Sequence, residues 1–178
     1  MSKSEFPINN HRSSRELSHE TSITVVGIGN EFRGDDAVGL MVLRQLKGST
    51  PTGARLIELA GDESHLLELM CSTDALIIVD AVQSSAPAGT IFRMDAGKER
   101  VPENLMFFST HSFGSLDAIE TARTLRHLPR CMLLYGIVGK DFSHKIGLAE
   151  EVENAIDVIE EKIIEELDSV RAHQNVWK

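Results

Sequence analysis

The sequence predicts an α/β fold: a three-layer sandwich in which about five mostly parallel, twisted strands form a sheet with helices on both faces. Two observations predict it. Short apolar runs alternate with longer, amphipathic stretches along the 178 residues. The run at 75–79 is apolar at every position. A strand of that composition is typical of a sheet that is covered on both faces.

Each element follows from a local pattern. Apolar runs bounded by glycine, proline or charged residues predict strands at 23–28, 55–59, 75–79, 90–94 and 131–138. The fourth of these follows the turn at 87–89 and is expected at an edge of the sheet. Helical patterns predict helices at 37–46, 63–70, 112–125 and, as a long amphipathic helix, from about 152 to 167. Asp35 and Asp36 are expected in the first turn of the first helix, where the helix dipole favours acids. Long connections are expected at 97–110 and 139–147.

One domain is expected over residues 22–173, because a chain of this length can bury a core of its own. Residues 1–21 are polar and lack the apolar centre of a signal peptide, so we expect a disordered or loosely packed arm there. No apolar stretch is long enough to span a bilayer, which favours a cytoplasmic location. A monomer or weak homodimer is expected.

The charge and the cysteines exclude several function classes. The formal net charge of −9 argues against nucleic-acid binding, which requires clustered Lys and Arg. It argues equally against docking on an anionic membrane. Cys71 and Cys131 form no CxxC pair, so neither a disulfide framework nor a zinc knuckle is predicted.

Three polar side chains are placed where predicted strands end or loops return: Asp36, Asp80 and His111. In sheets of this type, ligands bind beyond the carboxyl ends of the strands. Two carboxylates and an imidazole suit a divalent cation such as Zn²⁺ or Ni²⁺ and leave coordination positions open. Each residue also has a purely structural interpretation. Asp36 could be an acid at a helix terminus, Asp80 an acid that caps a loop, and His111 a histidine whose ring is hydrogen-bonded within the fold.

Other kinds of site are less well supported. The segment from Gly27 to Phe32 begins like GxGxxG but has Phe32 at the third glycine position, so a nucleotide-binding α/β domain remains only a weak alternative. There is no GxSxG motif, and Ser112 and Ser115 are only neighbours of His111 in sequence.

The motifs resemble those of the hydrogenase maturation proteases, the endopeptidases that process the large subunit of nickel–iron hydrogenases. The resemblance covers about residues 22–170. The matching blocks are 26–30 with 33–39, 77–82, 110–113 and, more loosely, 135–139 with 146–149. The family's acidic and proline-bearing residues after the fifth strand are replaced here by residues 140–144.

The resemblance implies an endopeptidase that removes a short C-terminal extension from the nickel-loaded precursor of a [NiFe] hydrogenase large subunit. By position, Asp36, Asp80 and His111 are the implied metal ligands and catalytic residues. The implied metal is Ni²⁺ carried by the substrate, and Zn²⁺ or Cd²⁺ could occupy the site in vitro. One carboxylate, as in an aspartyl protease, or a metal-bound water is expected to assist hydrolysis.

The resemblance also implies substrate-binding residues and leaves one alternative open. Gly29 and Asn30 are expected to shape the cleft, and Gly61 and Asp62 to lie in a turn beside it. The alternative is a nickel-binding accessory protein without peptidase activity, which would keep the three ligands but cleave nothing.

Overall fold

A computed structural model describes residues 21–49, 53–60, 64–100, 106–107 and 115–173. The predicted arm at 1–20 and the predicted site residues Gly61, Asp62 and His111 lie outside these ranges. The elements follow in the order β1 (Ile23–Ile28), η1 (Gly34–Ala37), α1 (Val38–Ser49), β2 (Arg55–Leu59), α2 (Ser64–Ser72), β3 (Ala75–Gln83), β4 (Ile91–Asp95), β5 (Met106–Phe107), α3 (Ser115–Leu125), β6 (Cys131–Val138), α4 (Glu150–Glu153) and α5 (Ala155–Ala172).

The strands form one sheet in the order β2-β1-β3-β6-β4, with β5 paired to the end of β3. The pairs β1–β2, β1–β3 and β3–β6 are parallel, whereas β4 and β5 run antiparallel to their partners. The predicted mostly parallel sheet is therefore confirmed, including the edge position of β4. The two-residue strand β5 lies inside the predicted 97–110 connection, because so short a strand leaves no periodic pattern.

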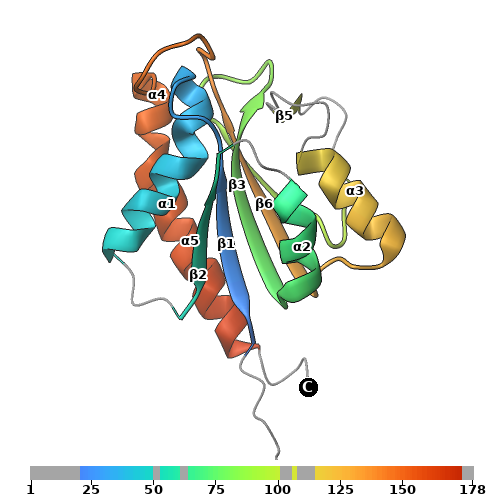
Figure 1. The fold of residues 1–178 in the computed structure, drawn as a ribbon. Helices are drawn as coiled ribbons and strands as arrows, with labels where there is room; N and C mark the ends of the chain where they lie inside the picture. Colours follow the sequence, from blue (N-terminus) through green and yellow to red (C-terminus); the bar gives the residue numbers. More distant parts are fainter. Residues whose placement is uncertain (1–20, 50–52, 61–63, 101–105, 108–114, 174–178) are drawn as a thin grey trace, which may run out of the picture.

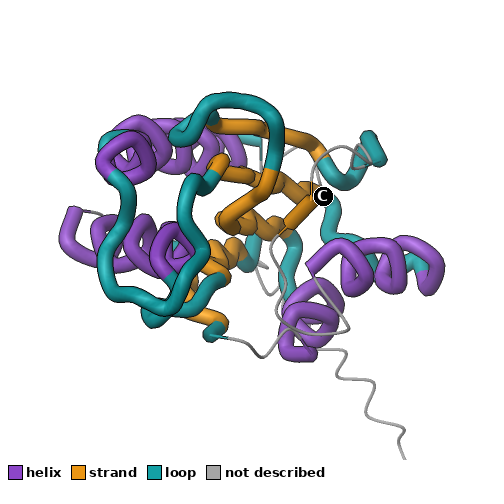
Figure 2. Tube along the Cα trace, turned by 90° about the horizontal axis from the view of Figure 1, so that it is seen from above, coloured by secondary structure: helices purple, strands orange, loops and turns teal. Residues whose placement is uncertain are grey.

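Helices cover both faces of the sheet, as predicted (Figure 1). Seen from above, the strands lie between helices on either side (Figure 2). Neighbouring strand residues point to opposite faces. Accordingly, Ile77 belongs to the apolar cluster that includes residues of α1 and α5, and Ile78 to the cluster that includes residues of α2 and α3.

The helix boundaries differ from the prediction in two places. Asp35 and Asp36 do not begin α1: they form the separate 3-10 turn η1 before it. The long final helix is interrupted at Asn154, which separates α4 from α5. Within the described part of the chain, no helix combines the length and the apolar composition needed to cross a membrane.

Candidate active site

Asp80 lies on the central strand of the sheet, one residue past the end of the β1–β3 pairing. Val79 is opposite Gly27 of β1, and Asp80 is opposite Gly136 of β6. The prediction placed Asp80 just after its strand, but β3 continues to Gln83 because β6 and β5 pair with its final residues. Asp80 is therefore held by backbone pairing in the sheet itself, and only 2% of it is exposed.

Asp36 lies in η1, which follows β1 and contacts β3. Its backbone N–H donates to the Arg33 carbonyl at 3.2 Å, and only 3% of the residue is exposed. Asp36 thus follows β1, and Asp80 lies on the neighbouring parallel strand β3, just past the end of its pairing with β1. This shared edge is where α/β sheets of this type bind their ligands.

The turn that joins β1 to η1 contains the two predicted cleft residues that the structure describes. Gly29 has a φ of +152°, and a Cβ at this position would collide with the Asp36 carbonyl. Asn30 stabilises the turn, since its Oδ1 accepts the Phe32 N–H at 3.0 Å. The close approach at Gly29 is therefore made by η1 rather than by a nucleotide phosphate, which argues against the dinucleotide alternative.

The two carboxylates are unusual in their burial. The Oδ1 atoms of Asp36 and Asp80 are buried and accept no hydrogen bond from the described residues, although each residue has other interactions. Burying a carboxylate is costly unless it is compensated by charge or hydrogen bonds. Carboxylate oxygens at such a place can bind a cation or hold a proton, which are the two tasks expected of a peptidase site.

The third predicted ligand, His111, lies outside the described residues, as do Gly61 and Asp62. Among the described residues, no three His, Cys, Asp or Glu side chains form a metal-binding group. Within those ranges the candidate site consists of Asp36 and Asp80.

Asp35 has a role that the sequence did not reveal. It is fully buried, and its carboxylate accepts three backbone hydrogen bonds from the loop between β6 and α4. The donors are the N–H groups of Lys140 at 2.7 Å, Asp141 at 2.8 Å and Ala149 at 2.6 Å. Hydrogen bonds to an ionised acceptor are among the stronger ones in proteins. Asp35 therefore fastens the 140–149 loop to the turn that carries Asp36.

Backbone pairing holds the same two segments together. Lys145 donates its N–H to the Phe32 carbonyl at 3.1 Å, and its own carbonyl accepts the Gly34 N–H at 2.9 Å. Gly34 has a φ of +56°, and a Cβ there would collide with the Asp141 carbonyl. Figure 1 shows the loop arching over the segment between β1 and α1. We call segments 32–36 and 140–149 together the rim.

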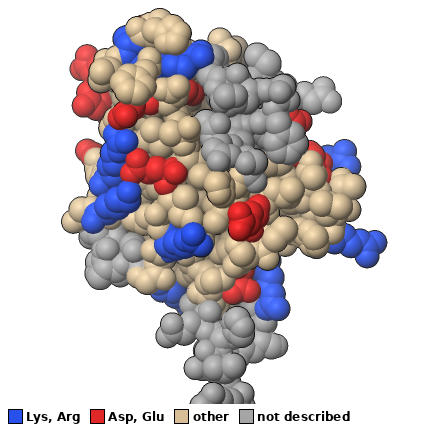
Figure 3. Space-filling model, in the orientation of Figure 1, with Lys and Arg blue, Asp and Glu red and all other residues tan. Residues whose placement is uncertain are grey.

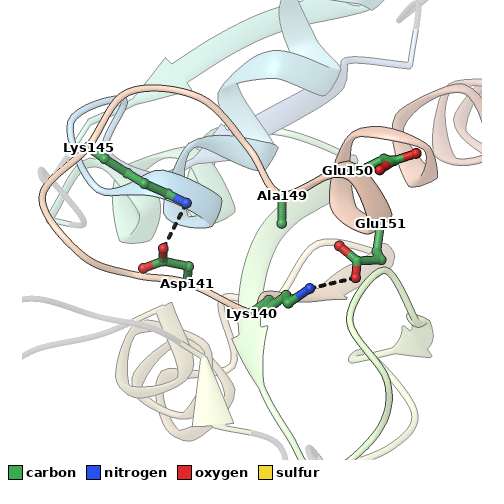
Figure 4. A pocket seen from close by; sticks show the side chains of 6 residues that line it. All are labelled: Lys140, Asp141, Lys145, Ala149, Glu150 and Glu151. Atoms are coloured by element: carbon green, nitrogen blue, oxygen red, sulfur yellow. Dashed lines mark hydrogen bonds and ion pairs between the residues drawn. The ribbon is translucent and has the colours of Figure 1, made fainter.

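The outer side of the rim contains a pocket of about 540 Å³ (Figure 4). Two ion pairs span its wall, Lys145–Asp141 and Lys140–Glu151, each at 2.7 Å. The Lys145 ammonium and the Ser143 N–H hold the pKa of Asp141 well below its usual range. Lys140 likewise lowers the pKa of Glu151. Lys145 and Lys140 are therefore each paired with a carboxylate that stays ionised at neutral pH.

Comparison with known proteins decides the family. A sequence model of the hydrogenase maturation protease family matches residues 42–166. The chain belongs to the hydrogenase maturation protease family. The match includes Asp80 and His111 and begins after Asp36. The family resemblance seen in the sequence motifs is thereby confirmed, and the protein is a peptidase of hydrogenase maturation.

Relatives and solved structures agree with this membership. The protease is 28% identical over 147 residues to the hydrogenase 2 maturation protease of Escherichia coli, covering 80% of this chain and 88% of the relative. It is 28% identical to the hydrogenase expression/formation protein HupD of Rhodobacter capsulatus, covering 64% of this chain and 55% of the relative.

Two solved structures share the fold. The hydrogenase maturating endopeptidase HybD from E. coli has a TM-score of 0.68 at 24% identity, covering 86% of this chain and 94% of that one. The [NiFe] hydrogenase maturation protease HybD from Thermococcus kodakarensis has a TM-score of 0.66 at 24% identity, covering 83% and 99%.

Proposed function

We propose that this protease removes a short C-terminal extension from the nickel-loaded precursor of a [NiFe] hydrogenase large subunit. One observation carries the proposal: two carboxylates are buried at the same edge of the sheet, Asp36 in the turn η1 after β1 and Asp80 near the carboxyl end of the neighbouring parallel strand β3. Membership of the maturation protease family supports a peptidase role. The structural neighbour from T. kodakarensis is a maturation protease of a [NiFe] hydrogenase, which supports the class of substrate.

In this proposal the nickel ion belongs to the substrate. Asp36 and Asp80, joined by His111, bind the ion that the precursor carries. Carboxylate and imidazole ligands suit such a cation. Binding the ion orients the precursor so that its scissile peptide lies against the rim. The site has to release the ion with the precursor after cleavage. Three protein ligands, which leave the other coordination positions of the ion to the precursor, therefore suit this task better than a complete set of protein ligands.

Hydrolysis then needs two proton transfers, one from the attacking water to the site and one from the site to the leaving nitrogen. A water molecule attacks the scissile carbonyl carbon, and one of the two carboxylates accepts the proton that the water loses. The same group returns the proton to the nitrogen of the departing extension as the C–N bond breaks. The products are a shortened large subunit with a new C-terminal carboxylate and a free peptide with a new amino terminus.

The test follows the mass of a purified nickel-loaded precursor after incubation with the protease. Wild-type protein should shorten the precursor, whereas Asp80→Ala and His111→Ala variants that remain folded should not. Variants that trim at the wild-type rate would show that the site is wrongly assigned. A wild-type protein that binds the precursor but never shortens it would favour the nickel-binding accessory protein instead.

A further inference from the structure

Two large apolar side chains are exposed on the rim, one on each of its two paired segments. Phe32 is 59% exposed and Ile146 is 78% exposed. Arg33 pairs with Lys145 in a parallel bridge, so Phe32 lies one residue before that pair on its segment and Ile146 one residue after it on the other. The other large apolar side chains exposed on the described part of the chain are Leu125 on α3 and Val158 on α5, and neither lies on the rim.

The exposure of this pair is fixed by the structure around it. The loop that carries Ile146 is held by the three hydrogen bonds to Asp35 and by the pairing with Phe32 and Gly34. Exposed apolar surface is unfavourable in water, and apolar surface that a fold holds exposed can serve as a binding site. A surface that is already ordered also loses little conformational entropy when a partner binds.

The position of the pair indicates its occupant. Phe32 and Asp36 lie in one turn of chain, and the Asp36 N–H donates to the carbonyl of Arg33. The two exposed side chains therefore lie on the segments that border the candidate site, Phe32 on the one that carries Asp36. The adjoining ion pair Lys145–Asp141 leaves no net charge beside it. In Figure 3, uncharged residues gather beside basic ones over the upper part of the molecule, where the loop between β6 and α4 lies in Figure 1.

We propose that Phe32 and Ile146 are the docking surface for apolar residues of the large-subunit precursor that flank its scissile peptide. This inference rests on the proposed function and adds a substrate-binding surface to it. Two residues bounded by ion pairs are too small an apolar area to hold a membrane, so the occupant is a polypeptide.

The experiment compares two pairs of surface variants. Phe32→Ser and Ile146→Ser should each raise the KM for the nickel-loaded precursor about tenfold, the effect typical of an interface anchor, and leave kcat unchanged. Leu125→Ser and Val158→Ser are the controls, because they remove apolar side chains that are 53% and 45% exposed elsewhere on the surface. An unchanged KM in the Phe32→Ser/Ile146→Ser double variant would overturn the docking surface while leaving the proposed function intact.

Binding is measured separately, so that the two proposals can fail independently. If wild-type protein never shortens the precursor, the proposed function fails, and the Kd for the precursor still tests the docking surface. The double variant should then bind about tenfold or more weakly than the Leu125→Ser/Val158→Ser control. Equal Kd values for the two double variants would overturn the surface.

A variant of Asp35 tests whether docking requires the 140–149 loop to be held in place. Asp35→Asn places an amide N–H₂ against at least one backbone donor, so the 140–149 loop should loosen. We expect faster cleavage by trypsin after Lys140 and Lys145, together with a rise in KM. A loop that trypsin cleaves faster while KM stays at the wild-type value would contradict a docking role for Ile146.

Discussion

The acidic residues at the two ends of β3 differ in their burial. At the amino end, Asp74 is partly exposed, and its Oδ2 accepts hydrogen bonds from the N–H and the hydroxyl of Ser22, both at 3.0 Å. At the carboxyl end, Asp80 is buried, with Asp36 buried in the turn after the neighbouring strand. A carboxylate that only joins two strand ends can stay in water, as Asp74 does.

The difference separates structural acids from candidate catalytic ones. Asp35 is as buried as Asp36, but its three backbone donors account for its burial structurally. Asp36 lies instead in the turn η1 that follows β1, and Asp80 near the carboxyl end of β3, at the edge where sheets of this type bind their ligands. This position makes them the candidates for catalysis that the predictions below test.

The largest expected effect is on processing, and it contrasts the two ends of β3 directly. Asp36→Asn and Asp80→Asn should each slow precursor processing by about 100-fold or more, because the neutral amide can neither accept the proton nor bind a cation as strongly. Asp74→Asn should process at the wild-type rate. The rates are measured by mass spectrometry of the precursor. If all three variants slowed precursor processing equally, the acids at the two ends of β3 would not differ in function.

The next largest effect is on stability. Asp35→Ala leaves three backbone N–H groups of the 140–149 loop without their acceptor, and should lower the free energy of unfolding by about 3 kcal/mol or more. Asp74→Ala should cost about 1 kcal/mol, because water can replace its partly exposed hydrogen bonds. Urea denaturation measures both values. A cost for Asp35→Ala no greater than that for Asp74→Ala would contradict its role in fastening the loop.

Two glycines of α1 should respond with opposite signs. A Cβ on Gly39 would collide with the carbonyls of Ile28 and Val79 at the carboxyl end of the sheet, so Gly39→Ala should destabilise by about 1–3 kcal/mol. Gly48 has open space around its Cβ position, and Gly48→Ala should stabilise the helix by about 0.5–1 kcal/mol. The shift in Tm shows the sign of each change. A Tm raised by Gly39→Ala would mean that α1 is not packed tightly against the strand ends.

The last effect appears only at high pH and concerns the middle of the sheet. Burial and the neighbouring Glu166 raise the pKa of Tyr135 to about 12, from an unfolded value of 10.0. A raised pKa contributes stability that is present below pH 10 and is lost as the pH rises toward 12, on the order of 2 kcal/mol. Tyr135→Phe should therefore flatten the fall in unfolding free energy between pH 10 and 12. If the unfolding free energy of this variant fell equally steeply, the loss of stability would come from other titrating groups.

Most of the fold could be predicted because its signals are local. The apolar run at 75–79 and the turn at 87–89 mark β3 and the start of β4 within a few residues. The order of the strands and the antiparallel direction of β4 come from contacts between distant segments, which a single sequence does not show. The two residues of β5 are too few to give a pattern.

The candidate site could also be predicted only in part. The strand-end rule placed Asp36 after β1, where the structure has it, and placed Asp80 just after a strand that in the structure continues to Gln83. The role of Asp35 could not be predicted, because its donors lie 105, 106 and 114 residues further along the chain. Two adjacent acids look alike in sequence, and only the loop that packs on them distinguishes them.

The hydrogen bonds of Asp35 also set an order for synthesis. Its acceptor oxygens are synthesised 114 residues before the N–H of Ala149. A nascent polypeptide that stops short of Ala149 lacks one of the donors and cannot complete the fastening. The rim is therefore completed only after all strands of the sheet, β1 to β6, have been synthesised.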